Sequence, residues 1–401
     1  MIFFLIDMDT KTIAQFISVY KDGLLDDTVR FWQRYSPDKQ YGGFLTFLDA
    51  DGKVVGTDKQ IWGQGRISWM FSRLYNRVEH KKEWLELARH GIDFLDKYAF
   101  DTDGRMFYSV TREGKPLRKR RYIFSECFGV IAFAEYAKAS GDPVLAKRAH
   151  ELYKLILKYT TTPGLLEPKL IPETRQLKSH SIPMILISIT QVLREFGNDP
   201  LYEKVINDAL YEIENHFLKP QFKALLENVG PNGEFIDEPM GRVVNPGHAI
   251  ETAWFIMEEG RFRNDSAIIS LGLKILDWSL EMGWDHEYGG IYYFRDVKGF
   301  PCEQYEHDMK LWWPHNEAIY ATLLAYYLTK EAKYEQWHKK IHDWAYAHFP
   351  DAKNGDWFGY LHRDGTVSST LKGNMWKGPF HLSRMQLNCW QLLEEMKTTK
   401  N

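Results

Sequence analysis

Apolar residues recur at helical spacing, i, i+3 and i+4, in about twelve segments that together cover most of the chain. Runs rich in glycine, proline and polar residues separate these segments, so we expect amphipathic helices joined by loops. The predicted helices cover residues 12–35, 61–77, 83–98, 125–139, 143–159, 181–196, 202–217, 248–259, 266–282, 316–328, 334–348 and 381–395.

A glycine-containing turn motif recurs between the helical segments at intervals of roughly 60 residues. Weaker echoes of it occur at 163–166 and 225–228. Each copy predicts a short β-hairpin or extended loop, and about six units of two helices fit the chain. The clear copies are Tyr41-Gly42-Gly43-Phe44, Asp103-Gly104-Arg105-Met106, Tyr288-Gly289-Gly290-Ile291 and Trp357-Phe358-Gly359-Tyr360.

Six helical hairpins bury their apolar faces when they close into a ring. We therefore predict an all-α (α/α)6 barrel that carries hairpin-like loops on one rim, with residues 1–401 as a single catalytic domain. An open helical solenoid is the alternative. The ring is favoured because Arg66, Glu126, His248 and Glu317 interrupt apolar stripes that should face a core. A solvent-filled pocket at the centre of a ring would accept such residues.

Composition narrows the function classes. Aromatic residues make up 15% of the chain, with 14 Trp and 22 Tyr, which suits a carbohydrate-binding cleft as well as a well-packed core. The net charge of -3 gives no electrostatic case for binding nucleic acid or an acidic membrane. A small-molecule ligand is therefore the expected partner.

Cysteine usage and the N-terminal segment bear on the compartment. Cys127, Cys302 and Cys389 lack metal-ligand spacing and indicate free thiols in a reducing environment. The chain starts with apolar residues but has no basic leader, and Asp7 and Asp9 interrupt the stretch, which is too short for a signal peptide or a membrane span. We expect a soluble cytoplasmic protein.

Two histidines stand in unusual local sequences. His248 follows Asn245-Pro246-Gly247 and His381 follows Lys377-Gly378-Pro379, so each is predicted at the start of a helix. A charged residue follows three positions later in both cases. Because imidazoles titrate near neutral pH, the pair predicts proton-transfer chemistry.

Several other polar residues admit two interpretations. The i, i+3 pair of His248 and Glu251 suits a tuned base or half of a metal site, but no second ligand set is present, so we expect no metal. A lone arginine flanked by aromatic residues, such as Arg66, usually forms a structural ion pair. Glu126 and His180, each near a helix start, suit caps, buried polar groups or supporting residues.

The sequence resembles the N-acylglucosamine 2-epimerase family, whose mammalian members are also called renin-binding proteins. The similarity runs in order through nearly the whole chain. It differs from the mammalian pattern at Leu382-Ser383, where Val-Pro is familiar. The motifs that carry it are Trp62-Gly63-Gln64-Gly65-Arg66, Ser125-Glu126-Cys127-Phe128, Ser181-Ile182-Pro183-Met184, Pro246-Gly247-His248-Ala249-Ile250-Glu251, Lys310-Leu311-Trp312-Trp313-Pro314-His315-Asn316-Glu317-Ala318, Asp356-Trp357-Phe358-Gly359-Tyr360 and Lys377-Gly378-Pro379-Phe380-His381.

The resemblance implies an (α/α)6 barrel that epimerises N-acetylglucosamine and N-acetylmannosamine at C2. It also implies that a nucleotide such as ATP acts as an activator, although the chain has no Walker A loop. A homodimer is compatible with the sequence, but no leucine-zipper heptad is present. The implied general acid/base residues are His248 and His381, and the implied substrate-binding or supporting residues are Arg66, Glu251, Glu317 and Arg384.

The chemistry of C2 epimerisation matches these residue types. Opening the sugar ring exposes an aldehyde, one base removes the C2 proton, and an acid on the opposite face returns a proton. Arg66 would stabilise the developing oxyanion at O1, and Glu251 would tune His248. No metal or redox cofactor is required. Three indoles are candidates for stacking on the sugar, namely Trp62, Trp313 and Trp376.

Competing functions remain open at this point. A cellobiose 2-epimerase or a mannose-type aldose–ketose isomerase would use the same chemistry on another sugar. A toroidal glycoside hydrolase or lyase would instead use paired carboxylates. A non-catalytic interaction protein would leave the two histidine motifs without a role. The candidate hydrolase carboxylates are Asp285, Glu287, Glu306 and Asp308.

Overall fold

The computed structural model describes residues 8–120, 122–168 and 170–400. The apolar segment 1–7, considered above as a leader or membrane span, lies outside the described residues. Within the described ranges, no helix has the length and apolar character that crossing a membrane requires.

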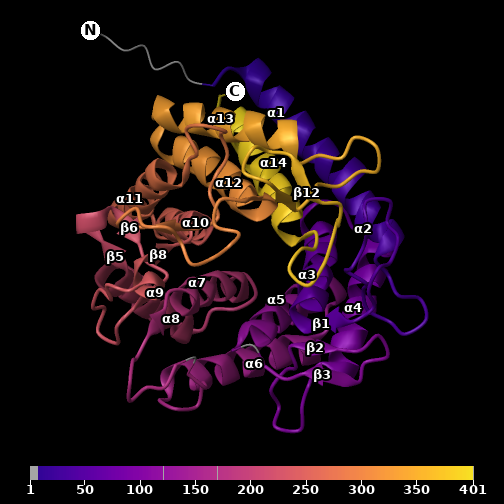
Figure 1. Ribbon diagram of the computed structural model, residues 1–401. Helices are drawn as coiled ribbons and strands as arrows, with labels where there is room; N and C mark the ends of the chain where they lie inside the picture. The colour runs from indigo at the N-terminus through magenta and orange to yellow at the C-terminus, as the bar shows by residue number, and fades with distance from the viewer. Residues whose placement is uncertain (1–7, 121, 169, 401) are drawn as a thin grey trace.

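The inner helices form a closed ring (Figure 1). Among the described residues, six inner helices each pack against the next, and the last packs back on the first. The predicted (α/α)6 barrel is therefore confirmed, and the open solenoid is excluded because a solenoid leaves its two ends apart. The inner helices are α3 (Ile61–Arg77), α5 (Phe124–Ser140), α7 (Ser181–Arg194), α10 (Pro246–Arg263), α12 (Trp312–Thr329) and α14 (Phe380–Lys400).

An outer layer of helices packs against the inner ring. Its first member is α1 (Thr10–Asp22), which continues through the π-helical turn Gly23–Thr28 into α2 (Val29–Tyr35) and packs on α14. The others each pack on the inner helix that precedes them. They are α4 (Lys82–Tyr98), α6 (Pro143–Thr161), α8 (Pro200–Glu212) with its π-helical extension Ile213–Phe217, α11 (Ser266–Gly283) and α13 (Ala332–His348).

Every helix predicted from periodicity is present, and among the helix starts the largest difference is in α12. α12 begins at Trp312 rather than at Asn316, so Pro314 lies inside its first turn. Proline is tolerated there because the first turn has no intrahelical acceptor for its missing N–H. Several other starts have side-chain caps, as in α6, where Asp142 accepts from the backbone N–H of Val144.

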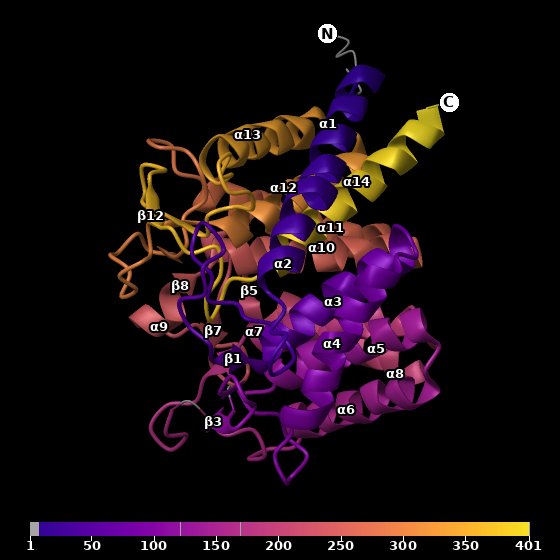
Figure 2. The same cartoon turned by 90° about the vertical axis from the view of Figure 1, so that its right-hand side faces the viewer.

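Short strands tie the loops together on one side of the ring (Figure 2). The strand before an inner helix pairs, in four cases within the described residues, with the loop that follows the next outer helix. These pairs are β1 (Lys59–Gln60) with β2 (Ser109–Val110), β4 (Lys178–Ser179) with β7 (Asn228–Val229), β8 (Val243–Val244) with β9 (Arg295–Asp296), and β10 (Lys310–Leu311) with β11 (Tyr360–Leu361).

The predicted turn copies take two forms. Two of them become hairpins, in which β2 pairs with β3 (Pro116–Arg118) and β11 pairs with β12 (Val367–Ser369). The copies near Gly43 and Gly290 form extended loops with isolated bridges. The remaining short elements are β5 (Leu218–Lys219), the 3-10 turn Pro220–Phe222, β6 (Ala224–Leu225) and α9 (Pro239–Arg242).

Buried lysine–aspartate pairs explain why the turn motif repeats. In each pair, the aspartate lies in the loop after an outer helix, and the lysine lies just before the inner helix that comes next in the chain. Gly43 and Gly290 close two of these loops at φ values of 67° and 73°, where Cβ atoms are disfavoured. The pairs are Asp38–Lys59 at 2.8 Å, Asp285–Lys310 at 2.9 Å and Asp356–Lys377 at 2.9 Å.

These pairs should contribute strongly to stability, since removing one partner leaves a buried charge without compensation. We expect Asp285→Asn to lower the free energy of unfolding by about 3–5 kcal/mol, because the Lys310 ammonium is fully buried. The matched control is Asp26→Asn, which breaks an exposed pair with Arg30 and should cost about 0.5 kcal/mol. Urea denaturation measures both, and equal small losses would contradict a structural role for the repeat.

Candidate active site

The two predicted histidines lie on the first turns of α10 and α14. Asn245 caps α10 and accepts the backbone N–H of His248 at 3.0 Å, while Pro246 occupies the first helical position. The predicted placement at helix starts is confirmed. Both imidazoles contact the ring of Trp313, with centroid distances of 5.0 Å for His248 and 5.6 Å for His381. The indole of α12 thus joins two side chains that are far apart in sequence.

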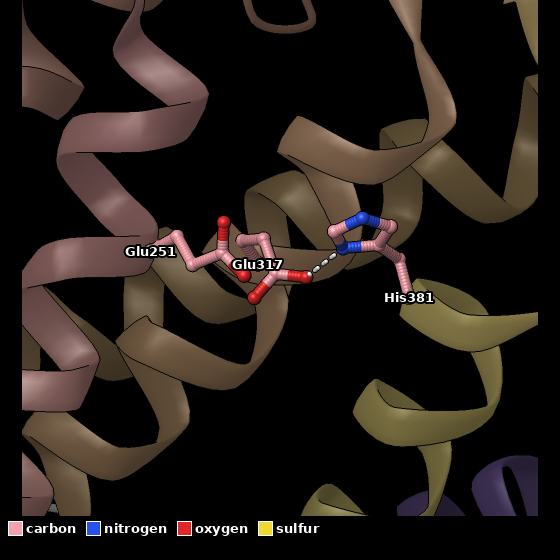
Figure 3. Close-up of side chains that lie close together, drawn as sticks. All are labelled: Glu251, Glu317 and His381. Atoms are coloured by element: carbon pink, nitrogen blue, oxygen red, sulfur yellow. Dashed lines mark hydrogen bonds and ion pairs between the residues drawn. The ribbon is translucent and has the colours of Figure 1, made fainter. Parts of the chain in front are cut away.

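A buried ion-pair network holds His381. Its Nδ1 lies 2.7 Å from Oε1 of Glu317, and Nη2 of Arg384 lies 2.7 Å from the same oxygen. Arg384 also pairs with Glu251, and Nε1 of Trp254 donates to Oε2 of Glu317 at 2.7 Å. Figure 3 shows Glu251, Glu317 and His381 converging from α10, α12 and α14. The network therefore links three inner helices.

The carboxylate contact decides the tautomer of His381. An ionised carboxylate only accepts hydrogen bonds, so Nδ1 of His381 must carry a proton and donate a hydrogen bond to Glu317. In the neutral ring Nε2 is then the basic nitrogen. Fixing one ring nitrogen in this way also fixes the orientation of the ring.

Three potential metal donors converge here, because atoms of Glu251, Glu317 and His381 all lie within 4.8 Å of one another. The guanidinium of Arg384 already binds both carboxylates and supplies the positive charge that a cation would bring. The chemistry of this donor set is therefore that of an ion-pair network rather than of a metal centre.

His248 has a partner that the sequence did not reveal. Its Nδ1 lies 3.0 Å from Oε2 and 3.1 Å from Oε1 of Glu227, in the loop between β6 and β7. Glu251 raises the pKa of His248 through its field, as predicted, but its direct ion pair is with Arg384, and Glu227 is the carboxylate that contacts the imidazole. The one feature of the sequence that marks Glu227 is the weak copy of the turn motif at 225–228. Glu227 lies near His248 only because the ring closes, and the spacing of residues along the chain does not show this.

His180 lies behind Glu227. Its Nε2 is 3.0 Å from the hydroxyl of Thr252, and its Nδ1 is 3.9 Å from Oε1 of Glu227. Burial lowers the pKa of His180 to about 4, so the ring is neutral at physiological pH. It makes no side-chain cap to α7. His180 therefore supports the carboxylate that holds His248.

The two imidazoles have pKa values that are shifted in opposite directions. For His248, burial opposes the charged form, but the charge and hydrogen bond of Glu227 outweigh it and raise the pKa, with a further contribution from the field of Glu251. For His381, burial lowers the pKa well below its usual range, and the positive charges of Arg66 and Arg384 act in the same direction. One ring therefore favours the protonated form and the other the neutral form.

Arg66 is a cation held by aromatic faces. Its guanidinium lies 4.1 Å from the ring centroid of Phe128, 5.0 Å from that of Phe380 and 5.4 Å from that of Trp62. Its Nε has no hydrogen-bond partner, and no ion pair joins it to a carboxylate within the described part of the chain. The structural ion pair expected for such an arginine is absent there. Burial lowers its pKa to about 10, so it stays charged.

A narrow cleft lies over Arg66. Trp62 and Trp376 line it from two sides, and their ring centroids are 5.4 Å apart. Asn374 and Met375 of the loop before α14 complete this wall. Two of the three indoles proposed to stack on a sugar thus meet at the cleft, whereas Trp313 lies between the histidines.

Two other carboxylates named in the sequence analysis are held in buried structural ion pairs. Glu126 lies on an inner helix but does not join the centre, because its carboxylate pairs with Arg105 at 2.5 Å and accepts the backbone N–H of Met106 at 3.0 Å. It fastens the loop after α4. Asp285, a candidate hydrolase carboxylate, is held by Lys310 and Arg363, which keep the pKa of that carboxyl well below its usual range. Neither carboxylate is available to a substrate.

Comparison with known proteins agrees with this geometry. A family model described as N-acylglucosamine 2-epimerase (GlcNAc 2-epimerase) matches residues 42–381. The chain is 35% identical over 381 residues to the N-acylglucosamine 2-epimerase of Bos taurus, covering 93% of this chain and 90% of the relative. It is 26% identical over 403 residues to the cellobiose 2-epimerase of Dictyoglomus turgidum, covering 95% and 98%. A solved cellobiose 2-epimerase from Spirochaeta thermophila has a TM-score of 0.84 at 22% identity, covering 96% and 98%.

The contact between Glu227 and His248 predicts a measurable titration shift. We expect Glu227→Gln to lower the pKa of His248 by about 1–2 units, because a hydrogen bond to a charged group is lost. Glu251→Gln is the matched control and should lower it less, since Glu251 acts only through its field. Imidazole NMR titration measures both shifts. A larger effect of Glu251→Gln would contradict the assignment of Glu227 as the partner.

Proposed function

The chain belongs to the N-acylglucosamine 2-epimerase family, and on that basis we propose that it interconverts N-acetylglucosamine and N-acetylmannosamine by proton transfer at C2. One observation carries the proposal: two imidazoles lie against Trp313, each with Nδ1 held by a carboxylate. The N-acyl sugar is favoured because the family model and the bovine relative both carry that name.

The proposed reaction begins from the ring-opened sugar. The C1 aldehyde acidifies the C2 proton, and the neutral Nε2 of His381 removes it to leave an enolate with its negative charge on O1. Protonated His248 then delivers a proton to the opposite face of C2. The unpaired cation of Arg66 stabilises the negative charge that develops at O1, a contribution of about 3–4 kcal/mol by analogy with oxyanion-hole donors.

The protonation states that remain after one turnover are those that the reverse reaction needs. His381 then carries the extra proton and His248 is neutral, so the same two groups exchange roles. Glu317 stabilises the protonated His381 as Glu227 stabilises the protonated His248. Proton transfer alone completes the conversion, so we infer that no metal or redox cofactor takes part. A nucleotide such as ATP would act only as an activator.

The proposed site draws on side chains from four of the six inner helices. Arg66 comes from α3, His248 and Glu251 from α10, Glu317 from α12 and His381 from α14. We therefore propose that the whole ring acts as one catalytic domain. A homodimer is compatible with this arrangement and is not required by it.

Cellobiose 2-epimerase activity is the second candidate. The aromatic pair of Trp62 and Trp376 over Arg66 would suit a second sugar ring, and relatives with that name cover nearly the whole chain. Incubating the protein with N-acetylmannosamine or with cellobiose and examining each product by NMR separates the two. Conversion of cellobiose alone would replace the proposed substrate while leaving the chemistry intact.

The two-base mechanism predicts a distinctive behaviour of single variants. His248→Asn and His381→Asn should each lower the epimerisation rate by about 10²–10⁴-fold, because each removes one proton-transfer group. Each variant should still exchange the C2 hydrogen of one epimer with solvent, and the two variants should act on opposite epimers. NMR of each pure epimer in deuterated water measures this. Loss of exchange from both epimers in both variants, with intact circular dichroism, would contradict separate bases.

The opposite pKa shifts predict the pH profile of kcat/KM. Activity should rise with pH as His381 loses its proton, at a pKa below the usual 6.5, and fall as His248 loses its proton, at a pKa above 6.5. In Glu227→Gln the alkaline limb should move to lower pH while the acid limb stays. Initial rates across pH 4–10 measure both limbs, and a profile with both limbs on the same side of 6.5 would sink the assignment.

A further inference from the structure

A second cavity opens at the end of the barrel opposite the proposed active site. It has a volume of about 390 Å³ and is lined mainly by residues from the middle and later turns of the inner helices, together with Phe380 and Arg384 from the start of α14. Trp69 of α3, Phe262 of α10 and Gln391 of α14 belong to the first group, whereas His248 and His381 lie on the first turns of their helices and Arg66 on the second turn of α3. The volume is in the range of small-molecule pockets.

Aromatic rings close the inner part of this cavity. Trp69, Trp254 and Phe380 line it, and the ring centroids of Trp69 and Phe380 are 5.2 Å apart. The Nε1 of Trp69 is buried and has no hydrogen-bond partner among the residues that the structure describes. The inner part of the cavity is thus a largely apolar aromatic surface.

Ion pairs between arginine and glutamate side chains form the walls of this cavity. Every guanidinium that lines the cavity already holds a carboxylate. An incoming anion would have to compete with those carboxylates, so the walls do not favour a charged ligand. The pairs are Arg73 with Glu135 and Glu195, Arg77 with Glu195, Arg194 with Glu259, Arg261 with Glu258 and Glu395, and Arg384 with Glu251 and Glu317.

Alternating guanidinium and carboxylate groups suit hydroxyl groups instead. A hydroxyl both donates and accepts, so one can donate to a carboxylate such as Glu195 while it accepts from a guanidinium such as Arg77. Side chains of Ser188 and Asn388, which also line the cavity, add neutral donors and acceptors. An aromatic floor beneath such polar walls matches the apolar face and hydroxyl rim of a pyranose.

We propose that this cavity is a second binding site, which takes a neutral monosaccharide. Arg384 and Phe380 form the partition between the two sites, since they line this cavity and also contact the network around His381 and the Arg66 cation. The inference rests on the proposed function only for the first sugar to be tested, which is the substrate itself.

The test follows two indole N–H resonances in 15N-labelled protein. Trp69 reports the second cavity and Trp313 reports the active site, with assignments from Trp69→Phe and Trp313→Phe. N-acetylmannosamine is titrated into the His381→Asn variant, which should not convert it. We expect both resonances to shift, each with its own midpoint.

A variant that fills the second cavity distinguishes ligand binding in that cavity from an indirect effect of ligand binding in the active site. Asn388→Trp should weaken the Trp69 response at least tenfold and leave the Trp313 midpoint within twofold, whereas Asn388→Ala should keep both. The proposal is overturned if the Trp69 resonance does not shift when the active site, reported by Trp313, is saturated. It is also overturned if the Trp69 resonance shifts with the same midpoint as the Trp313 resonance and still does so in Asn388→Trp.

Titrations with other ligands define what the second cavity binds and distinguish failure of this proposal from failure of the proposed function. Glucose should shift Trp69 if the cavity takes neutral sugars in general, and a response to the N-acetylated sugar alone restricts the site to that class. A response to inorganic phosphate without a response to either sugar would overturn the proposal. A shift of Trp69 with no shift of Trp313 would support the second cavity and count against the proposed substrate.

Discussion

The carboxylate of Glu317 is the contact on which the site depends. It binds His381 and Arg384 through one oxygen and Trp254 through the other, while Arg384 also binds Glu251. Burying two carboxylates together is costly unless a cation is shared between them, and the guanidinium supplies that cation. The same contacts fix the tautomer of His381 and leave Nε2 as its basic nitrogen. Glu317 therefore contributes to packing, to charge balance and to the proposed proton transfer.

Ring closure makes this arrangement possible. Most residues of the site lie on the first two turns of inner helices. Side chains on rigid helices are positioned more precisely than side chains on loops. Buried lysine–aspartate pairs and two-residue strands fasten the loops on the same rim. The rim therefore serves as a frame for the helix starts, and the opposite end of the ring is left open to a separate cavity.

Much of this could be predicted from sequence because it is local. Helical periodicity, the turn repeat and the Pro-Gly-His motif reflect contacts between near neighbours in the chain. Glu227 could not be found in this way, since it reaches His248 from a loop that only the closed ring brings near. The effect of Glu251 on His248 was predicted from their helical spacing, but its ion pair with Arg384 of the last helix was not, for the same reason. Glu126 was left open between a buried polar group and a supporting residue, and its ion pair with Arg105 makes it a buried structural group.

The most direct test of the central claim is isotope entry during the first few per cent of reaction in deuterated water. If two imidazoles serve opposite faces of C2, the product should carry one solvent deuterium at C2 while the unreacted sugar remains unlabelled. NMR or mass spectrometry of both sugars at early times decides this. A product that retains its original C2 hydrogen, or a substrate pool that gains deuterium as fast as product forms, would contradict a mechanism with two bases.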